Sequence, residues 1–294
     1  MECERKDKLA AAYLRFTFFI VFMVLLAGAG IVQADETAVA GRKIMNSYKD
    51  AVVKVEVVMQ SKVEMNGKEI MNKEFKSEVT GTVLDESGLI LVSLTTIDPS
   101  KFMDSIMRGM ESDMKMEVKM DIKKVKVILP DETELDAKVV LRDKDLDMAF
   151  IQPRQKTARP MVSIKMAEQS TPHIMDEIII LSRLSKVAEH APSAMSARIS
   201  AIVNKPRTFY IPQVEGGDTQ DIGTPAFTLD GKLVGVILMR ILASEGGAGF
   251  GSMMGGAGAM GITAVIMPVS EILEASKQVA EETKEETKKP KVKE

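Results

Sequence analysis

Residues 223–236, GTPAFTLDGKLVGV, place two short runs of apolar and β-branched residues on either side of an Asp-Gly pair. Such runs are typical of strands, and Asp-Gly between them is typical of a tight hairpin turn. Residues 80–91, TGTVLDESGLIL, repeat this arrangement, and residues 127–140 do so again around a turn at 130–133. The three stretches predict an antiparallel, all-β fold.

The same pattern of short apolar runs continues along most of the chain. A stretch with Pro and Arg at 153–160 divides the runs into two groups of about six. We therefore expect two β-barrels, the first over 45–155 and the second over 160–276. The expected strands are 51–59, 78–84, 89–94, 125–129, 137–141 and 148–152, then 177–181, 195–204, 225–229, 233–240 and 263–267.

Three segments depart from this pattern. A Met-rich insertion covers 98–120, a Gly/Met-rich loop covers 245–261, and a charged tail covers 277–294 after a short helix from 269 to about 279. Four methionines of the insertion are spaced as on one face of a helix, which favours an apolar stripe. The alternative is a soft-metal site, because thioethers bind Cu(I). These methionines are Met103, Met107, Met110 and Met114.

Residues 1–34 are typical of a targeting segment. Basic residues precede an apolar run over 16–32, and Val32-Gln33-Ala34 offers small residues for a signal peptidase. We expect a signal peptide; the alternative is an N-terminal membrane anchor. Either way, the rest of the chain is expected outside the cytoplasm, in the periplasm or extracellular.

Composition excludes several classes of protein and site. The net charge of −3 over 294 residues argues against nucleic acid as a partner. Cys3 is the single cysteine and belongs to the targeting segment, so no disulfide or Cys-based metal site is expected. With two histidines, His173 and His190, no multi-histidine site can form. We expect no cofactor and no metal.

Five stretches, taken in order, resemble the protease domain of HtrA/Deg-type serine proteases over about residues 51–276. They are 80–91, 127–140, 142–150 (RDKDLDMAF), 198–202 (RISAI) and 223–236. The resemblance implies the trypsin-like double six-stranded β-barrel with a short C-terminal helix. HtrA-type enzymes commonly carry a C-terminal peptide-binding PDZ domain and form trimers. Because the chain ends soon after the second barrel, we expect no PDZ domain. Assembly into a homo-oligomer is left as an alternative to a monomer.

The resemblance also places the catalytic residues. This family uses a Ser nucleophile, a His base and an Asp that orients the His. Asp147 takes the place of the Asp, but Thr95 takes that of the His and Ile222 that of the Ser. Gln220 replaces a Gly that shapes the oxyanion hole, whose positions are Gln220 and Ile222. The triad is therefore expected to be degenerate, with no catalytic residue.

Structural roles, without a part in catalysis, are expected for the other polar candidates. Asp147 without its His partner is expected to accept backbone N–H groups. His173 and His190 fall in the second barrel and are expected to be surface or loop histidines. Thr224 lies two residues past the nucleophile position, and the loop length argues against it as a substitute.

These observations favour an exported protease homologue that is catalytically inactive, a pseudoprotease that binds polypeptide or a partner protein. A tether to the membrane through residues 1–34 stays open. The competing hypothesis is an active serine-type endopeptidase with a displaced or atypical triad.

Overall fold

The computed structural model describes residues 35–100, 116–157, 159–213, 221–241 and 262–288. Residues 37–294 cluster as one unit, which holds both sheets, and residues 1–36 form another. The predicted targeting segment, the loop at 245–261, Gln220 and the four spaced methionines of the insertion lie outside the described residues. Among the described residues, no helix has the length and apolar character needed to cross a membrane.

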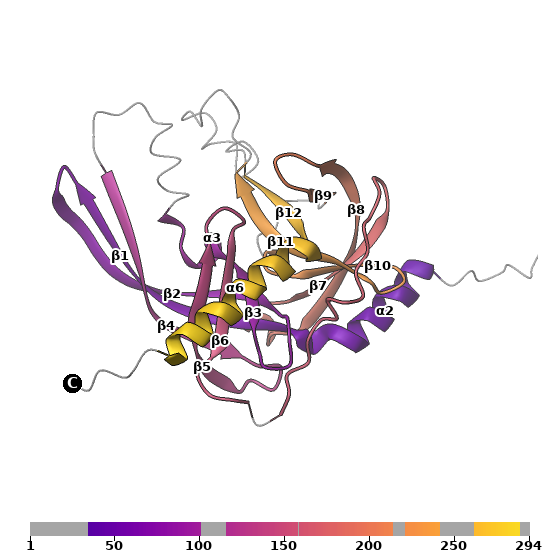
Figure 1. The fold of residues 1–294 in the computed structure, drawn as a ribbon, viewed down its shortest axis with the longest axis horizontal. Coiled ribbons are helices and arrows are strands. Elements are labelled where there is room, and N and C mark those ends of the chain that lie inside the picture. The colour runs from indigo at the N-terminus through magenta and orange to yellow at the C-terminus, as the bar shows by residue number, and fades with distance from the viewer. Residues whose placement is uncertain (1–34, 101–115, 158, 214–220, 242–261, 289–294) are drawn as a thin grey trace, which may run out of the picture. The chain divides into compact units, whose positions relative to one another are not determined.

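Two closed antiparallel barrels make up the fold (Figure 1). The strand order is β1-β2-β3-β6-β5-β4 in the first and β10-β11-β12-β9-β8-β7 in the second, which confirms the predicted double barrel. The first barrel comprises β1 (Val52–Met65), β2 (Lys68–Val83), β3 (Ile90–Ser93), β4 (Met116–Ile128), β5 (Glu134–Asp143) and β6 (Met148–Pro153). The second comprises β7 (Glu177–Arg183), β8 (Pro192–Val203), β9 (Phe209–Gln213), β10 (Pro225–Thr228), β11 (Leu233–Ile241) and β12 (Ile262–Pro268).

The strands differ from the expected ones at particular places. The β1–β2 hairpin extends past its apolar half to a turn at Asn66 and Gly67, both of which have positive φ. Asn-Gly suits such a turn because both residues tolerate the left-handed region. β4 begins at Met116, so the end of the Met-rich insertion is strand. β9 was not expected, because prolines at 206 and 212 interrupt its apolar pattern.

Helices cover the ends of the barrels. The helical segments are α2 (Glu36–Tyr48), η1 (Lys49–Ala51), α3 (Leu94–Ile97), η2 (Lys186–Ala188) and α6 (Val269–Lys288). α6 begins where predicted and continues into the charged tail. It packs on β5 of the first barrel and on β11 and β12 of the second (Figure 1). An ion pair of 2.7 Å between Arg207 and Glu271 ties it to the second barrel.

An apolar core joins the two barrels and fixes their relative placement. One buried cluster contains Leu91 and Phe150 from the first barrel together with Leu181 and Phe227 from the second. The ring of Tyr48, at the end of α2, stacks on Phe227 with centroids 4.9 Å apart. Burial of large apolar side chains on both sides of the junction stabilises it as a unit. The polar groups described next lie at this same junction.

Candidate functional site

Asp147 lies in the turn between β5 and β6 and has a left-handed backbone, with φ of 58°. Its Oδ1 accepts the backbone N–H and the hydroxyl of Thr95, each at 2.7 Å. Its Oδ2 accepts the backbone N–H of Met239 at 2.9 Å and the hydroxyl of Ser93. Four donors therefore converge on one carboxylate.

This arrangement determines what Asp147 can do. Burial raises the pKa of Asp147, and the hydrogen bonds from Ser93, Thr95 and Met239 oppose that rise. Met239 is in β11, so the carboxylate also links the two barrels. In a Ser-His-Asp triad the imidazole N–H donates to this carboxylate. Here the side chain that donates from the expected histidine position is the hydroxyl of Thr95.

Ile222, at the expected nucleophile position, is 5% exposed and belongs to the apolar core of the second barrel. The following residue, Gly223, is held on both sides. Its N–H donates to the carbonyl of Ile237 at 2.7 Å, and its carbonyl accepts the hydroxyl of Thr82 at 2.7 Å. Its φ is 89°, and a Cβ there would lie 2.0 Å from the carbonyl oxygen of Thr80. Glycine is thus required for this loop to pack on β2.

Thr224 was considered above as a substitute nucleophile. It is completely buried, and its hydroxyl donates to the carbonyl of Asp221 at 2.5 Å. The hydroxyl therefore does not face a space that a substrate could enter. Gln220, the other oxyanion-hole position, lies outside the described residues.

A cavity of about 390 Å³ lies beside Ile222 and has walls from both barrels. Lys54 of β1 lines it, although this side chain is only 4% exposed. Its Nζ donates to the hydroxyl of Thr80, its cross-strand neighbour, at 2.9 Å. Burial lowers the pKa of Lys54, while Glu78 and Asp221 act in the opposite direction. No motif marks Lys54 in the sequence, where it lies with Glu56 in a run of valines.

His190 lies in a loop, one of the two places expected for it, and it is buried there. Its ring is 3% exposed and bridges two carboxylates of the first barrel. Nδ1 lies 2.9 Å from Glu132 and Nε2 lies 3.0 Å from Glu78. Burial acts to lower the pKa of His190, but hydrogen bonds and charges from Glu132 and Glu78 outweigh it and raise the pKa. A sequence gives no sign that loops of two barrels will meet here.

Arg183 accompanies His190 at the junction and is 4% exposed. Its guanidinium donates to the backbone carbonyls of Val52, Lys49 and His190 at 2.8 to 2.9 Å. Asp50 is 3.8 Å away. Arg183 and His190 therefore fasten the second barrel to the start of β1, to β2 and to the β4–β5 turn.

His173, by contrast, is exposed and lies 3.5 Å from Asp176. Neither histidine of the sequence is hydrogen-bonded to Asp147. Within the described part of the chain, no group of three or more His, Cys, Asp or Glu residues could hold a metal ion.

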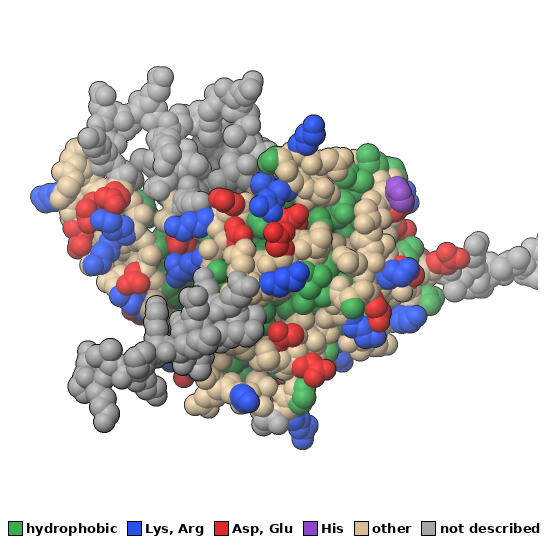
Figure 2. All heavy atoms as spheres, in the orientation of Figure 1, with side chains coloured by type: hydrophobic (Ala, Val, Ile, Leu, Met, Phe, Trp, Pro, Cys, Tyr) green, Lys and Arg blue, Asp and Glu red, His purple; other side chains and the backbone are tan. Residues whose placement is uncertain are grey.

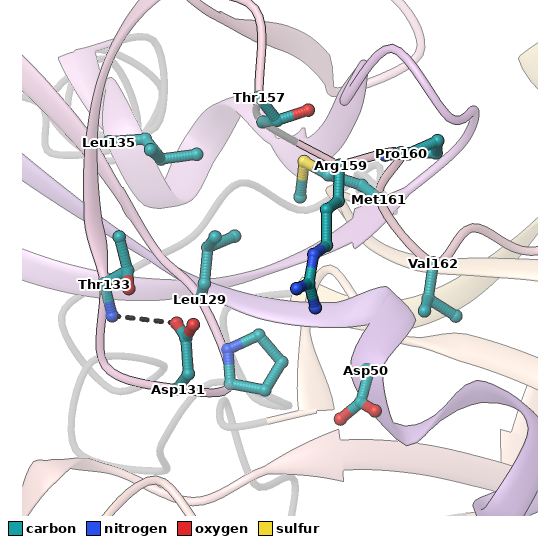
Figure 3. A pocket seen from close by; sticks show the side chains of 11 residues that line it. Asp50, Leu129, Asp131, Thr133, Leu135, Thr157, Arg159, Pro160, Met161 and Val162 are labelled. Atoms are coloured by element: carbon teal, nitrogen blue, oxygen red, sulfur yellow. Dashed lines mark hydrogen bonds between the residues drawn. The ribbon is translucent and has the colours of Figure 1, made fainter.

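A second cavity, of about 720 Å³, lies along the segment that connects the barrels. Figure 3 shows the side chain of Arg159 pointing into it between Asp50 and Leu129. Arg159 is exposed, so water can solvate its charge. Of the described residues that line this cavity, none also lines the one beside Ile222.

Acidic and basic side chains are interspersed over the face shown in Figure 2, without a large area of one sign among the coloured residues. Mixed charge of this kind gives no field that would steer a polyanion to this face.

Comparison with known proteins agrees with this geometry. The model of the trypsin-like peptidase domain matches residues 79–236, from the end of β2 to β11. No curated protein matches the chain. The family match covers more than half of the 294 residues and includes Thr95, Asp147 and Ile222. The chain therefore belongs to the trypsin-like peptidase family.

Proposed function

We propose that this chain is an exported, catalytically inactive member of the family, of the HtrA/Deg type, which binds polypeptide without cleaving it. The observation that carries the proposal is the pair of contacts at the triad positions. Thr95 donates its hydroxyl to Asp147, and Ile222 is packed in the core where the nucleophile is expected.

The chemistry of these side chains supports inactivity. Acyl transfer by this fold needs a base that takes the proton of the nucleophile at neutral pH. A threonine hydroxyl has no basicity in that range, and an isoleucine side chain has no atom that can attack a carbonyl. Asp147 is held by four donors, two of them backbone N–H groups, so its role is to hold the barrels together.

A double barrel that is retained without cleavage chemistry can still bind a polypeptide. The cavity beside Ile222 lies where the reacting part of a peptide is expected to sit in this family, and both barrels line it. Clefts of a few hundred Å³ with a small number of polar groups are typical ligand sites. Export rests on the targeting character of residues 1–34, which also leave a membrane tether open. We also propose that several copies of the chain associate, which a measurement of the oligomeric state would test.

The competing proposal is an active hydrolase with an atypical site, and one observation favours it. The amine of Lys54, whose pKa burial lowers, contacts the hydroxyl of Thr80. A lysine base beside a hydroxyl nucleophile is a known variant of the triad. Against this, Thr80 is 4% exposed, which hinders approach of a peptide bond.

One experiment separates these proposals. The full-length chain is incubated with fluorescently labelled, unfolded casein, and anisotropy and fragment size are followed in the same samples. We expect saturable binding of intact casein by the wild-type chain. Cleavage that Lys54→Met abolishes would support the atypical hydrolase, and absence of both binding and cleavage would contradict both proposals.

A further inference from the structure

Lys54 carries a buried charge that the described protein leaves without a counter-ion. Its side chain is 4% exposed, and its recorded hydrogen bond goes to a neutral hydroxyl, that of Thr80. Within the described part of the chain Lys54 forms no ion pair, and the charges of Glu78 and Asp221 act on it from farther away. A buried ammonium without a charged partner is energetically unfavourable. The negative charge of a ligand bound beside Lys54 would offset this cost.

The surrounding charges leave room for an anion. Glu78 also lines the cavity, but its carboxylate is hydrogen-bonded to Nε2 of His190 at 3.0 Å. Glu78 and Asp221 attract the ammonium of Lys54 through their electrostatic fields, Glu78 more strongly than Asp221, and the positive field of Arg183 opposes both. Among the described residues, therefore, no carboxylate contacts the ammonium of Lys54 directly.

The remaining walls suit a carboxylate in particular. Ser77 and Ser185 line the cavity, and their hydroxyls can donate to a second oxygen of the ligand. Thr80 and Thr96 line it as well, but the hydroxyl of Thr80 accepts from Lys54 and that of Thr96 donates to the carbonyl of Ser93. Ile222 adds an apolar wall beside them. A volume of about 390 Å³ admits a carboxylate together with one or two residues, but not a folded domain.

We propose that this cavity binds the carboxylate of a polypeptide ligand, with Lys54 as its ionic partner and the neighbouring hydroxyls as additional donors. The inference rests on the polypeptide binding proposed above and specifies its chemistry. The α-carboxylate at a chain end is the source we favour, because Ile222 and β2 bound the cavity and a terminus needs no exit. A Glu side chain supplies the same chemistry and is distinguished below.

Three fluorescent hexapeptides with one aliphatic sequence test the proposal on the full-length chain by anisotropy. One ends in a free carboxylate, one ends in an amide, and one ends in an amide but carries an internal Glu. We expect the free acid to bind at least about 10-fold more tightly than the plain amide, since a charge-assisted contact of this kind is strong. Lys54→Met should abolish the difference.

Lys62→Met is the matched control, because Lys62 lies on the same strand but is exposed. This variant should keep the preference for the free acid. If the Glu-bearing amide matches the free acid and both depend on Lys54, the proposal stands with a side chain as the source. If all three peptides bind equally to the wild type, carboxylate recognition is overturned while polypeptide binding survives. If none binds, both fall.

Should Lys54→Met fail to fold, as judged by circular dichroism, the wild-type ratio of free acid to amide decides the question. Salt is then varied as well. Because the contact to Lys54 is buried, salt should reduce the preference for the free acid only modestly, and equal binding of the free acid and the amide at low ionic strength would overturn the assignment.

Discussion

The hydroxyl of Thr95 and the carboxylate of Asp147 are hydrogen-bonded at 2.7 Å, and the backbone N–H of Thr95 reaches the same oxygen at the same distance. One residue thus fills one side of the carboxylate. The other oxygen accepts Met239 from the second barrel. A carboxylate that would orient a histidine in an active enzyme acts here as a link between α3 and β11.

Replacing Asp147 by Ala should destabilise the junction. The backbone N–H groups of Thr95 and Met239 would lose their acceptor, which predicts a loss of about 3 kcal/mol in the free energy of unfolding. Urea denaturation measures it. Asp145→Ala, in the same turn but exposed, is the control and should change stability by less than about 0.5 kcal/mol. Equal effects of the two substitutions would contradict this role.

Replacing Lys54 by Met should leave stability unchanged or raise it in the absence of ligand, because an apolar isostere avoids burial of the charge. The pKa of Lys54 is lowered in the folded state, so the unfolded chain binds more protons between the folded-state pKa and the ordinary lysine pKa of 10.5. Wild-type stability should therefore rise relative to Lys54→Met as the pH increases through that window. A difference that does not change with pH would contradict a buried ammonium.

His190 predicts the opposite dependence on pH. Its pKa is raised above 6.5 in the folded state, so its contacts with Glu132 and Glu78 contribute fully below that value. The contribution is lost as the pH rises through the folded pKa. The stability difference between the wild type and His190→Asn should therefore shrink as the pH rises from 6.5 through the folded-state pKa. His173→Asn, at an exposed site, is the control for the substitution itself and should change stability by less than about 0.5 kcal/mol.

Gly223 and Gly231 form a matched pair for testing how the 221–225 loop packs. Both have positive φ, 89° and 87°. A Cβ at Gly231 would have its nearest neighbour at 3.9 Å, whereas one at Gly223 would meet the carbonyl oxygen of Thr80 at 2.0 Å. Gly231→Ala should cost about 1 kcal/mol for the backbone alone. Gly223→Ala should cost clearly more in thermal unfolding, and similar losses would contradict the packing described.

Most strands of the two barrels could be predicted because a strand with one buried face shows alternating apolar residues in the sequence. Val53, Val55, Val57 and Met59 alternate toward the core of the first barrel, and the strand they form was expected. Its outer half, residues 60–65, is held by pairing with β2 and β4, and its charged residues carry no such signal. β9 was not predicted for the same reason. It forms because β8 and β12 pair with it, although Pro212 interrupts its apolar pattern.

The candidate site was predictable only where a motif marks it. Thr95 and Asp147 were identified from their places in family-like stretches, and the structure brings them into contact. Lys54, Glu78 and His190 come from three separate segments of the chain. Their proximity depends on how one barrel packs on the other, which no local pattern of residues encodes.

The most direct test of the central claim is the release of new amino termini from unfolded casein by the purified full-length chain. The assay spans pH 5 to 9, with and without a fluorophosphonate that modifies reactive hydroxyl nucleophiles. We expect no release above the buffer blank and no mass increase on the chain. Release of amino termini that the fluorophosphonate abolishes, with one phosphonyl group added to the chain, would contradict it.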